Sequence, residues 1–589
     1  MLNNKFIIAL ILVAAVIIPY YNIFYNGFAY DDIDFFKKWE GVKSLRNIPS
    51  FFLGDLPMNH QHAYRPVRGI MQAVVYHFSK ENTFGYHLFS ILVHLASVFF
   101  IYLITKKILD NLSALVTATI FAVLPIHTEA ITFMTASFDI AGITFLLASF
   151  YFYILSESGQ KKYFFISLAL AALAFFTYEV ALVLPLLIIL YDACVKNFTK
   201  TEFFARAKTY ASYFALAMLF FTIRYVVSMR TYNGTLGEGI NFFSRMVTMP
   251  KALLEYLYMT IVNIPLNIYH DITTAHALSD PGVLFSLGII FALIALGIYF
   301  YKKGKRLYAF IIFWFFISLI PVSNIVQIAL FFNERYAYLA SFAWALLCGL
   351  VFQKTYSLLF KKNMALYTTL PFIILSASYA YMTWQRNGDW ENDKKLWSKT
   401  IEQNPKYASA YVGLAYYNRD KKDYGEAEKN LNAAMQLDPE FFLAHESMGE
   451  VYMEQKKFTE AIPYFQKAIL LRDNYASSYH NIAFSYHSLG QLKDAEINYL
   501  KAIEIYPRYF LSNKNLAAIY LGNEEYGKAI QQLKKTLEIQ NNDYELYYAL
   551  GISYLAQGEK NLAEESFQET LEIKPDFAPA EEELKKITP

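Results

Sequence analysis

Long apolar runs separated by short polar stretches fill the first 385 residues of the chain. Most of these runs contain about 16 to 22 residues, close to the roughly 20 residues with which an α-helix crosses a bilayer. We expect eleven membrane spans, at residues 5–23, 88–105, 112–126, 138–155, 162–177, 179–194, 208–228, 282–301, 307–322, 335–353 and 365–384. Residues 250–268 are also apolar, but they include Pro250 and Glu255, and we expect a re-entrant or interfacial helix there.

Basic residues fall on alternate connections between the spans. They are Lys106 with Lys107, Lys161 with Lys162, the 196–208 connection, Lys302 to Arg306, and Lys361 with Lys362. Cytoplasmic loops carry an excess of Lys and Arg, so we expect these connections in the cytoplasm. An inside N-terminus and eleven crossings then place the C-terminal third outside.

The C-terminal third resembles itself every 34 residues from about residue 408, which is the period of the tetratricopeptide helix pair. Small residues recur in the first helix of each pair, at Ala415, Gly449, Ala483, Ala517 and Gly551. Close crossing of the two helices requires small side chains at that position. Five repeats are more than the three needed for a continuous core, and the concave groove of such an array usually holds a peptide or protein segment.

Composition supports this division and excludes some functions. Apolar residues make up 56% of the chain and charged residues 17%, which is too apolar for a soluble protein of this length. A net charge of +2 gives no electrostatic reason for a nucleic-acid partner. The two cysteines, Cys194 and Cys348, lie in or beside apolar runs and indicate neither a disulfide framework nor a thiolate metal site.

An acidic cluster directly follows the first apolar run. Residues 30–34 read Tyr-Asp-Asp-Ile-Asp, so Asp31 and Asp32 are expected at the outer membrane surface. Such carboxylates can simply form the solvated boundary of a span. Alternatively, one of them can act as a general base for a hydroxyl that attacks the anomeric carbon of a sugar phosphate.

Other polar residues recur at the expected outer ends of spans, since charge is costly at the bilayer centre. They are Arg65, His127, Glu129, Asp139, Glu179, Arg224, Glu334 and Arg335. Arg224 and Arg335 can hold a phosphate, although each alone is also explained by a side chain that extends to the interface. His87 and His94 share a helix face; without a nearby third ligand in the sequence, we expect packing or hydrogen bonding there.

These residues in this order, followed by a repeat array, resemble the TMTC family, the transmembrane and tetratricopeptide-repeat-containing O-mannosyltransferases of the GT-C class. The resemblance spans almost the whole chain and rests on Asp31-Asp32, Tyr64-Arg65-Pro66, His87 with His94, Pro125 to Ala130, Asp139, Glu179, Glu334-Arg335 and Trp390. It implies an acidic catalytic residue in the Asp31-Asp32 pair, a polyprenyl-phosphate sugar as donor and no essential metal.

Three positions depart from the family pattern. Ser137 stands where Arg is common, Tyr178 where Lys is common, and Ser90 where Asn is common. Substrate identity in the family depends on outer-loop groups of this kind, so mannose is the default donor sugar here.

We therefore expect an all-α protein with a GT-C-like transmembrane domain at 1–386, a leading half-repeat at 387–407, five tetratricopeptide repeats at 408–577 and a C-terminal cap at 578–589. The predicted activity moves a sugar from a polyprenyl- or dolichyl-phosphate donor to a protein Ser or Thr hydroxyl. Asp31 or Asp32 serves as base, and Arg335, helped by Arg224, stabilises the departing phosphate.

Two other functions are also consistent with the sequence. The membrane helices can merely anchor a repeat scaffold that gathers partner proteins, or they can form a transporter or flippase for lipid-linked sugars. Polar residues gathered at one side of the membrane favour chemistry at a surface over a path through it. High Lys, Asn and Ile content favours a bacterial cytoplasmic membrane, with the endoplasmic-reticulum membrane as the alternative.

Overall fold

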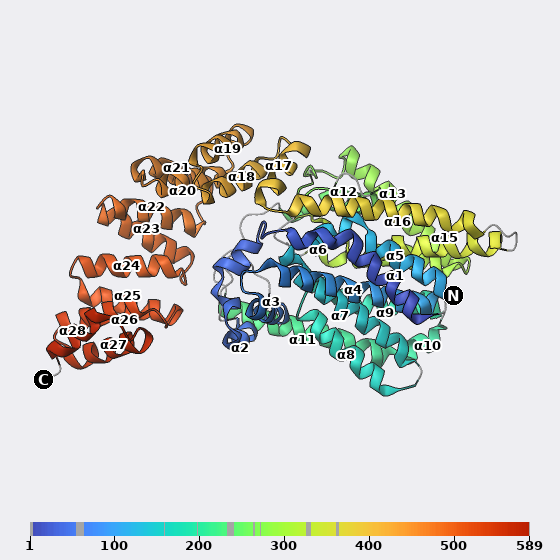
Figure 1. Cartoon of the computed structure of the whole chain (residues 1–589), viewed down its shortest axis with the longest axis horizontal. Coiled ribbons are helices and arrows are strands. Elements are labelled where there is room, and N and C mark those ends of the chain that lie inside the picture. The colour runs from blue at the N-terminus through green and yellow to red at the C-terminus, as the bar shows by residue number, and fades with distance from the viewer. Residues whose placement is uncertain are drawn as a thin grey trace. The chain divides into compact units, whose positions relative to one another are not determined.

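The computed structural model describes residues 4–54, 64–157, 159–196, 198–231, 241–262, 266–270, 272–325, 331–360 and 365–587. These residues form helices and connecting loops, without a strand among them (Figure 1). They divide into two compact units, one within residues 4–403 and one from residue 404 onward. The all-α fold class predicted from the sequence is confirmed.

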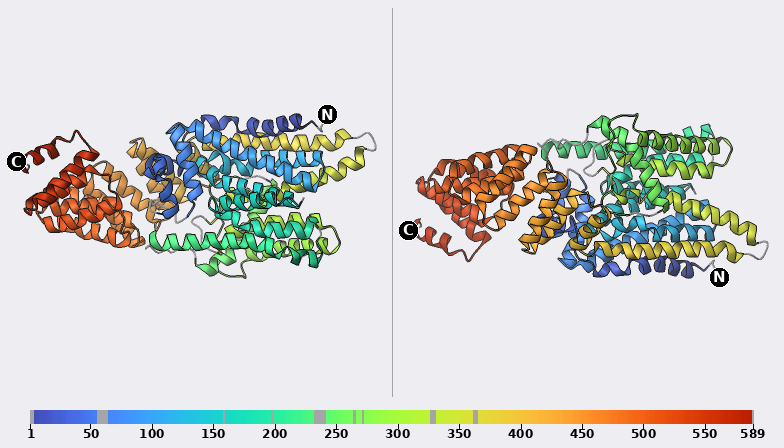
Figure 2. Two further views of the ribbon diagram at one scale, coloured as in Figure 1. Left: turned by 90° about the horizontal axis from the view of Figure 1, so that it is seen from below. Right: turned by 90° about the horizontal axis from the view of Figure 1, so that it is seen from above.

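The first unit is a bundle of long, roughly parallel apolar helices (Figure 2). Six helical segments in the described part of the chain are long and apolar enough to cross a membrane. They are α1 (Lys5–Tyr20) with its continuation η1 (Tyr21–Tyr25), α4 (Thr83–Ile108), α7 (Met134–Ser156), α11 (Ala207–Thr231) up to Val227, α13 (Pro281–Lys302), and α15 (Phe342–Phe360) up to Leu359.

A seventh candidate span is bent. Helix α5 (Asn111–Val123) is followed by η5 (Pro125–His127) and α6 (Thr128–Thr132), at an angle of 53°. Proline cannot donate the backbone hydrogen bond that would continue α5, so Pro125 explains the break. The bend places α6 across the end of the bundle, where it carries Glu129.

The remaining predicted spans correspond to shorter or less apolar helices. They are α8 (Lys161–Phe175), α9 (Leu184–Tyr191), α14 (Arg306–Ser318) and α16 (Ala365–Asn387). The number of eleven spans therefore stays a prediction. Residues 250–262 belong to α12 (Phe242–Val262), and 263–265 lie outside the described residues, so the crossing of that segment also stays a prediction.

Helices α1 and α16 end at the same place. Both views in Figure 2 show α1, in dark blue, alongside α16, in yellow. Asn26 Nδ2 donates to the carbonyl of Asn387 (2.9 Å), and His87 Nε2 near the start of α4 lies 3.2 Å from the carbonyl oxygen of Asn26. We call this end, where α1 and α16 finish and α4 and α7 begin, the Asp31 end of the bundle.

Short helices cover the Asp31 end. They are η2 (Asp34–Lys38), η3 (Glu40–Lys43), η4 (Leu45–Asn47), α2 (Ile48–Leu53) and α3 (Pro66–Ser79). After α16 the chain forms η10 (Gly388–Trp390) and α17 (Asp393–Gln403), which still belong to the first unit. At other connections of this unit lie η6 (Glu179–Val183), η7 (Asp192–Lys196), α10 (Lys200–Ala205), η8 (Ile320–Val322) and η9 (Glu334–Ala337).

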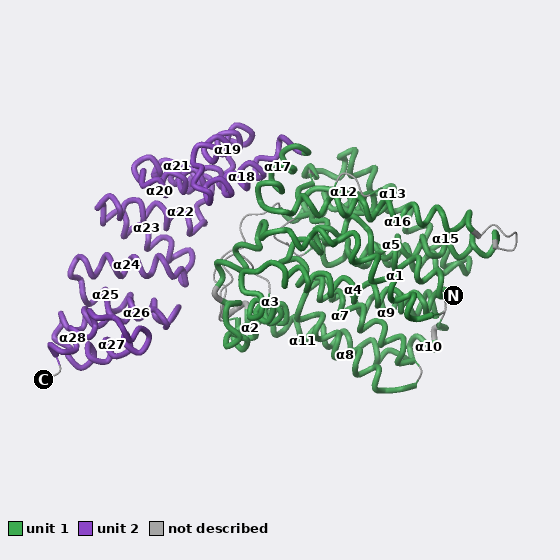
Figure 3. The backbone as a smooth tube through the Cα atoms, viewed as in Figure 1, with its two compact units in different colours: residues 1–232, 238–403 green, residues 233–237, 404–589 purple. Residues whose placement is uncertain are grey.

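The second unit is a stack of antiparallel helix pairs (Figure 3). The pairs are α18 (Ala408–Asp420) with α19 (Tyr424–Leu437), α20 (Phe442–Glu454) with α21 (Phe458–Leu471), α22 (Ala476–Ser488) with α23 (Leu492–Ile505), α24 (Phe510–Gly522) with α25 (Tyr526–Ile539), and α26 (Tyr544–Ala556) with α27 (Lys560–Ile573). Helix α28 (Ala578–Ile587) follows the last pair. A Cβ on Gly449 would meet the Phe465 ring at 2.6 Å, which explains the small residue at that position of the repeat.

Candidate active site

The two neighbouring aspartates at the Asp31 end have different environments. Asp32 is 1% exposed. It accepts hydrogen bonds from the backbone N–H (2.8 Å) and hydroxyl (2.6 Å) of Thr135 and, at 3.4 Å, from the N–H of Ala29. Thr135 lies in the first turn of α7, whose N–H groups have no partner within the helix. Asp32 therefore fastens its loop to the start of α7.

The backbone carbonyl of Asp31 accepts from the Phe35 N–H at 3.1 Å, but its carboxylate makes no hydrogen bond or ion pair with another described residue, and the residue is only partly buried. Burial raises the pKa of its carboxyl group to about 6, although the positive charges of Arg335 and Arg68 lower it. Burial also raises the pKa of Asp32, to about 7, against the hydrogen bonds from Thr135 and Ala29 that favour its carboxylate. Of the two aspartates, Asp31 thus has the carboxylate available to a substrate.

Arg335, whose charge acts on Asp31, is held by Glu129. The Arg335 guanidinium donates through Nη1 to Glu129, and the Arg335 backbone N–H donates to the same carboxylate at 3.0 Å. The guanidinium also lies 5.9 Å from the ring centre of Phe133. An arginine has five N–H donors, so Arg335 keeps donors for an anion after its bond to Glu129.

A second group of ion pairs joins α3 to α7 and η6. Arg65 donates to Asp139 (2.9 Å) and to Glu179 (2.8 Å), and Arg68 Nε lies 3.3 Å from Asp139. Pro66 occupies the first turn of α3 and keeps the preceding Arg65 out of helical geometry, so α3 starts there. Arg68 follows one turn later and points to the same carboxylate.

Arg224 completes this second group, with Nη1 3.4 Å from Glu179. Glu334, next to Arg335 in η9, is instead buried against another arginine. It accepts from His270 Nε2 (3.0 Å) and lies 3.4 Å from Nη2 of Arg386 at the end of α16. The predicted acidic residues and arginines thus form three separate groups of ion pairs, and the pair of Arg335 with Glu129 belongs to neither of the other two.

The histidines are packed inside the bundle. His127 Nε2 lies 2.8 Å from the Ser341 hydroxyl, and the His127 ring lies against Tyr338 with ring centres 4.4 Å apart. His94 contacts the Tyr338 hydroxyl at 2.7 Å. Among the described residues there is no group of three or more His, Cys, Asp or Glu side chains placed to hold a metal ion. A role of His127 in substrate binding stays a prediction.

Helix α17 contacts the loop that carries Asp31. The Tyr30 N–H donates to Asp393 at 2.6 Å, and the Gly27 N–H donates to the Glu391 carbonyl at 2.9 Å. Tyr30 has φ +57°, a left-handed conformation that costs energy for a residue with a side chain. The bond to Asp393 fixes this conformation immediately before Asp31. Sequence reasoning treated α17 only as a leading half-repeat.

Sequence reasoning also missed Arg68 and Arg386. Arg68 could have been found from its spacing, three residues after Arg65 across Pro66. Arg386 ends the last apolar run, where a lone cation is ordinarily explained by the membrane interface. Its contact with Glu334 joins residues 52 positions apart, and no local pattern indicates it.

Comparisons with known proteins match both units. A model of the dolichyl-phosphate-mannose-protein mannosyltransferase family matches residues 61–225, and tetratricopeptide-repeat models match 408–441, 440–508, 498–531 and 544–577. Protein O-mannosyl-transferase F38B6.6 of Caenorhabditis elegans is 25% identical over 445 residues, which cover 73% of this chain and 62% of that protein. Protein O-mannosyl-transferase TMTC3 of Homo sapiens is 30% identical over 129 residues, or 21% of this chain and 14% of that protein.

The chain thus spans less than two thirds of the length of these curated relatives. Among solved structures, the tetratricopeptide protein YrrB superposes on 32% of this chain and 97% of its own, with 21% identity and a TM-score of 0.29. The repeats are therefore assigned from the family models. Together, the mannosyltransferase and repeat matches on one chain confirm the resemblance to the TMTC family.

Proposed function

We propose that this chain, with the domain organisation of the TMTC family, is a membrane glycosyltransferase that moves a sugar from a polyprenyl-phosphate donor to a protein hydroxyl on the extracytoplasmic face. Mannose is the default sugar, because the matched family model and the named relatives are mannosyltransferases. The observation that carries the proposal is the Asp31 carboxylate, which pairs with no other side chain in the described part of the protein and is acted on by the charge of Arg335.

In the proposed reaction, the acceptor hydroxyl oxygen attacks the anomeric carbon of the donor sugar. The bond from that carbon to the phosphate oxygen breaks, and the phosphate keeps the bonding electron pair. Asp31 takes the hydroxyl proton, for which a carboxylate with a raised pKa is a better acceptor than an ordinary one. Attack on the face opposite the leaving phosphate inverts the anomeric configuration.

Arg335 is the proposed partner of the departing phosphate. Its bond to Glu129 fixes the guanidinium before the donor arrives, and preorganised charge stabilises a developing anion without reorganisation during the reaction. The ion pairs of Arg65 and Arg68 with Asp139 brace α3 against α7 near Asp31. Arg65, Asp139, Glu179, Arg224 and Glu334 therefore shape the site in this proposal.

The positions of the basic residues support an extracytoplasmic site. Helix α4 begins at the Asp31 end and, over 26 residues, leads about 39 Å to Lys106 and Lys107 in its last turn. Helix α7 also begins there, and α8 after it starts with Lys161 and Lys162. Because basic connections stay in the cytoplasm, the Asp31 end is proposed to face outward, and the repeats to bind the protein acceptor.

Substitution of Asp31 tests the proposal. Asn keeps the shape of Asp31 but cannot take a proton, so Asp31→Asn should lower the transfer rate about 100- to 10,000-fold. Asp34→Asn is the matched control, because Asp34 is exposed three residues after Asp31 and its side chain pairs with Lys38 at 2.9 Å. The assay is sugar transfer from a polyprenyl-phosphate mannose to an acceptor protein, measured by the mass of the product. Wild-type rates for Asp31→Asn, at normal protein levels, would overturn the mechanism and favour the scaffold alternative.

A further inference from the structure

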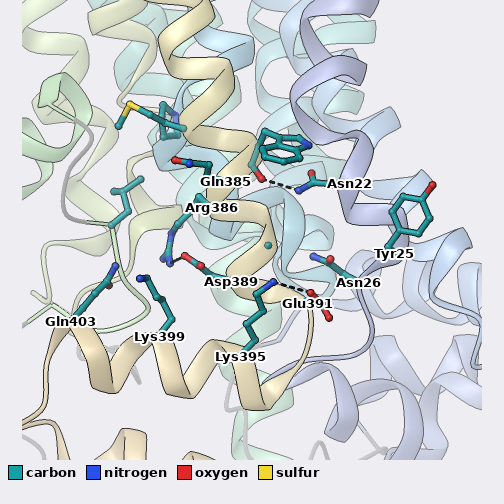
Figure 4. Close-up of a pocket in the computed structure, with 15 residues that line it drawn as sticks. Asn22, Tyr25, Asn26, Gln385, Arg386, Asp389, Glu391, Lys395, Lys399 and Gln403 are labelled. Atoms are coloured by element: carbon teal, nitrogen blue, oxygen red, sulfur yellow. Dashed lines mark hydrogen bonds and ion pairs between the residues drawn. The ribbon is translucent and has the colours of Figure 1, made fainter.

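A cavity of about 880 Å³ lies at the Asp31 end between η1, the end of α16, and α17 (Figure 4). All of its lining residues belong to the first unit. The lining from η1 and α16 includes Asn22, Tyr25, Met382 and Trp384, and the lining from the segment that begins with η10 and ends with α17 includes Asp389, Glu391, Lys395 and Lys399. The ion pairs described around Asp31 do not use Lys395 or Lys399, so the proposed reaction leaves these two side chains without a role.

The surface beside the cavity has the pattern of a membrane interface. Apart from Tyr367 in the first turn of α16, the large hydrophobic side chains exposed along α1 and α16 are aliphatic or phenyl up to the last turns, where exposed Tyr21, Tyr25, Tyr381 and Trp384 replace them. Tyrosine and tryptophan gather at the level of the lipid headgroups in membrane proteins. Tyr25 and Trp384 also line the cavity, so we expect it at the depth of the lipid headgroups.

Three basic and two acidic side chains line the cavity, and Arg386 donates from Nη1 to one of the acidic ones, Asp389, at 3.0 Å. Arg386 is 8% exposed, and its Nε makes no hydrogen bond to a described residue. In Figure 4 the polar ends of Arg386, Lys399 and Gln403 point into the same part of the cavity. Lys395 approaches from the side of Glu391, to which it is bonded at 2.8 Å.

The two lysines can leave their present partners at low cost. Lys395 and Glu391 are each about half exposed, and Lys399 pairs with the exposed Glu402 at 2.9 Å. Exposed ion pairs of this kind contribute little to stability, because water and salt screen them and ordering two long side chains costs entropy. A doubly or singly charged phosphate offers several strong acceptor oxygens and competes well for ammonium groups.

We propose that this cavity binds the phosphate headgroup of a membrane lipid, with the lipid chain lying along the exposed apolar side chains of α1 and α16. The site is separate from Asp31 and Arg335, and it does not depend on the proposed sugar transfer. Two lipids share the required chemistry: a polyprenyl phosphate without sugar, and an anionic phospholipid of the bilayer.

Lipid retention by the purified full-length protein tests the proposal. The protein is incubated separately with polyprenyl phosphate, phosphatidylglycerol and uncharged diacylglycerol, and bound lipid is measured by native mass spectrometry. We expect retention of one or both phosphate lipids over diacylglycerol. Retention of polyprenyl phosphate alone would identify the carrier lipid, and retention of phosphatidylglycerol would identify bulk lipid as a source.

The test variant is Lys395→Gln/Lys399→Gln, since both side chains are at least partly exposed and their loss should not impair folding. We expect its affinity for the retained lipid to fall about 5- to 30-fold, from the loss of two basic contacts near the membrane surface. Lys394→Gln/Lys406→Gln is the charge-matched control, because neither residue lines the cavity. Equal retention by the two variants, or no preference for phosphate lipids over diacylglycerol, would overturn the proposal. Phosphatidylglycerol carries no transferable sugar, so its retention is informative even if the proposed activity fails.

Discussion

Asp32→Ala should destabilise the membrane unit, whereas Asp31→Asn should not. Removing the Asp32 carboxylate leaves three donors without their acceptor: the Thr135 N–H, the Thr135 hydroxyl and the Ala29 N–H. An unsatisfied buried polar group costs about 1–3 kcal/mol. The Ala29 contact is long, and water can reach some of the freed donors, so we expect a total loss of about 2–5 kcal/mol. Asp31 makes no comparable bond, and its replacement by Asn should be nearly neutral.

Thr135→Val separates the parts of this effect. It removes the hydroxyl bond of 2.6 Å and keeps the backbone bond of 2.8 Å, so its cost should be close to one hydrogen bond to a charged group, about 1.5–3 kcal/mol. Because Thr135 and Asp32 share that bond, the double variant Thr135→Val/Asp32→Ala should be less destabilised than the sum of the single variants.

The assay is thermal unfolding of the detergent-solubilised protein, followed by loss of the monodisperse peak in size-exclusion chromatography. Midpoint temperatures should decrease in the order Asp31→Asn, Thr135→Val, Asp32→Ala, with Asp31→Asn close to the unchanged protein. Asp32→Ala with an unchanged midpoint would refute the view that this carboxylate fastens the loop to α7. Additive effects of Thr135→Val and Asp32→Ala would refute their direct coupling.

Three other predictions follow from the same structure. With Asp31 as the base, kcat/KM for sugar transfer should be level above its pKa of about 6 and fall up to tenfold per unit of pH below it, because the base acts only when deprotonated; a level profile down to pH 5 would exclude this assignment. A chain ending at residue 407 should transfer sugar to a short free acceptor but poorly to a protein, whereas a chain ending at residue 389, without Asp393, should transfer to neither acceptor. If the chain ending at residue 407 lost transfer to the short acceptor and to the protein equally, the repeats would support the site itself. Protease outside intact spheroplasts should digest residues 408–577, and digestion only from the cytoplasmic side would contradict the proposed orientation.

Sequence periodicity predicted much of the fold because its signals are local. The 34-residue period of the second unit comes from small residues at helix crossings, such as Gly449 against Phe465. The long apolar runs likewise became membrane-type helices. Short or interrupted apolar runs were harder to assign as membrane spans, because a bend such as that at Pro125 or a 15-residue helix such as α8 fits several topologies.

The division of roles between the two aspartates could not be predicted. It depends on Thr135, 103 positions away from Asp32, and Arg335 depends on Glu129, 206 positions away. Both contacts arise only when α7, α6 and η9 meet at one end of the bundle. The positions of the acids and arginines at span ends could be predicted from the sequence, because the free-energy cost of a charged side chain inside the bilayer limits where such residues can lie.

The position of α17 has a consequence for the construction of chimaeric enzymes. Because Asp393 bonds to the backbone of Tyr30, a repeat array taken from another protein should be joined after Gln403, so that α17 stays with its own bundle. A junction at residue 387 would bring a foreign helix against the Asp31 loop. If the proposed function holds, such a junction should exchange acceptor preference with the repeats and leave the chemistry of transfer with the residues that precede them.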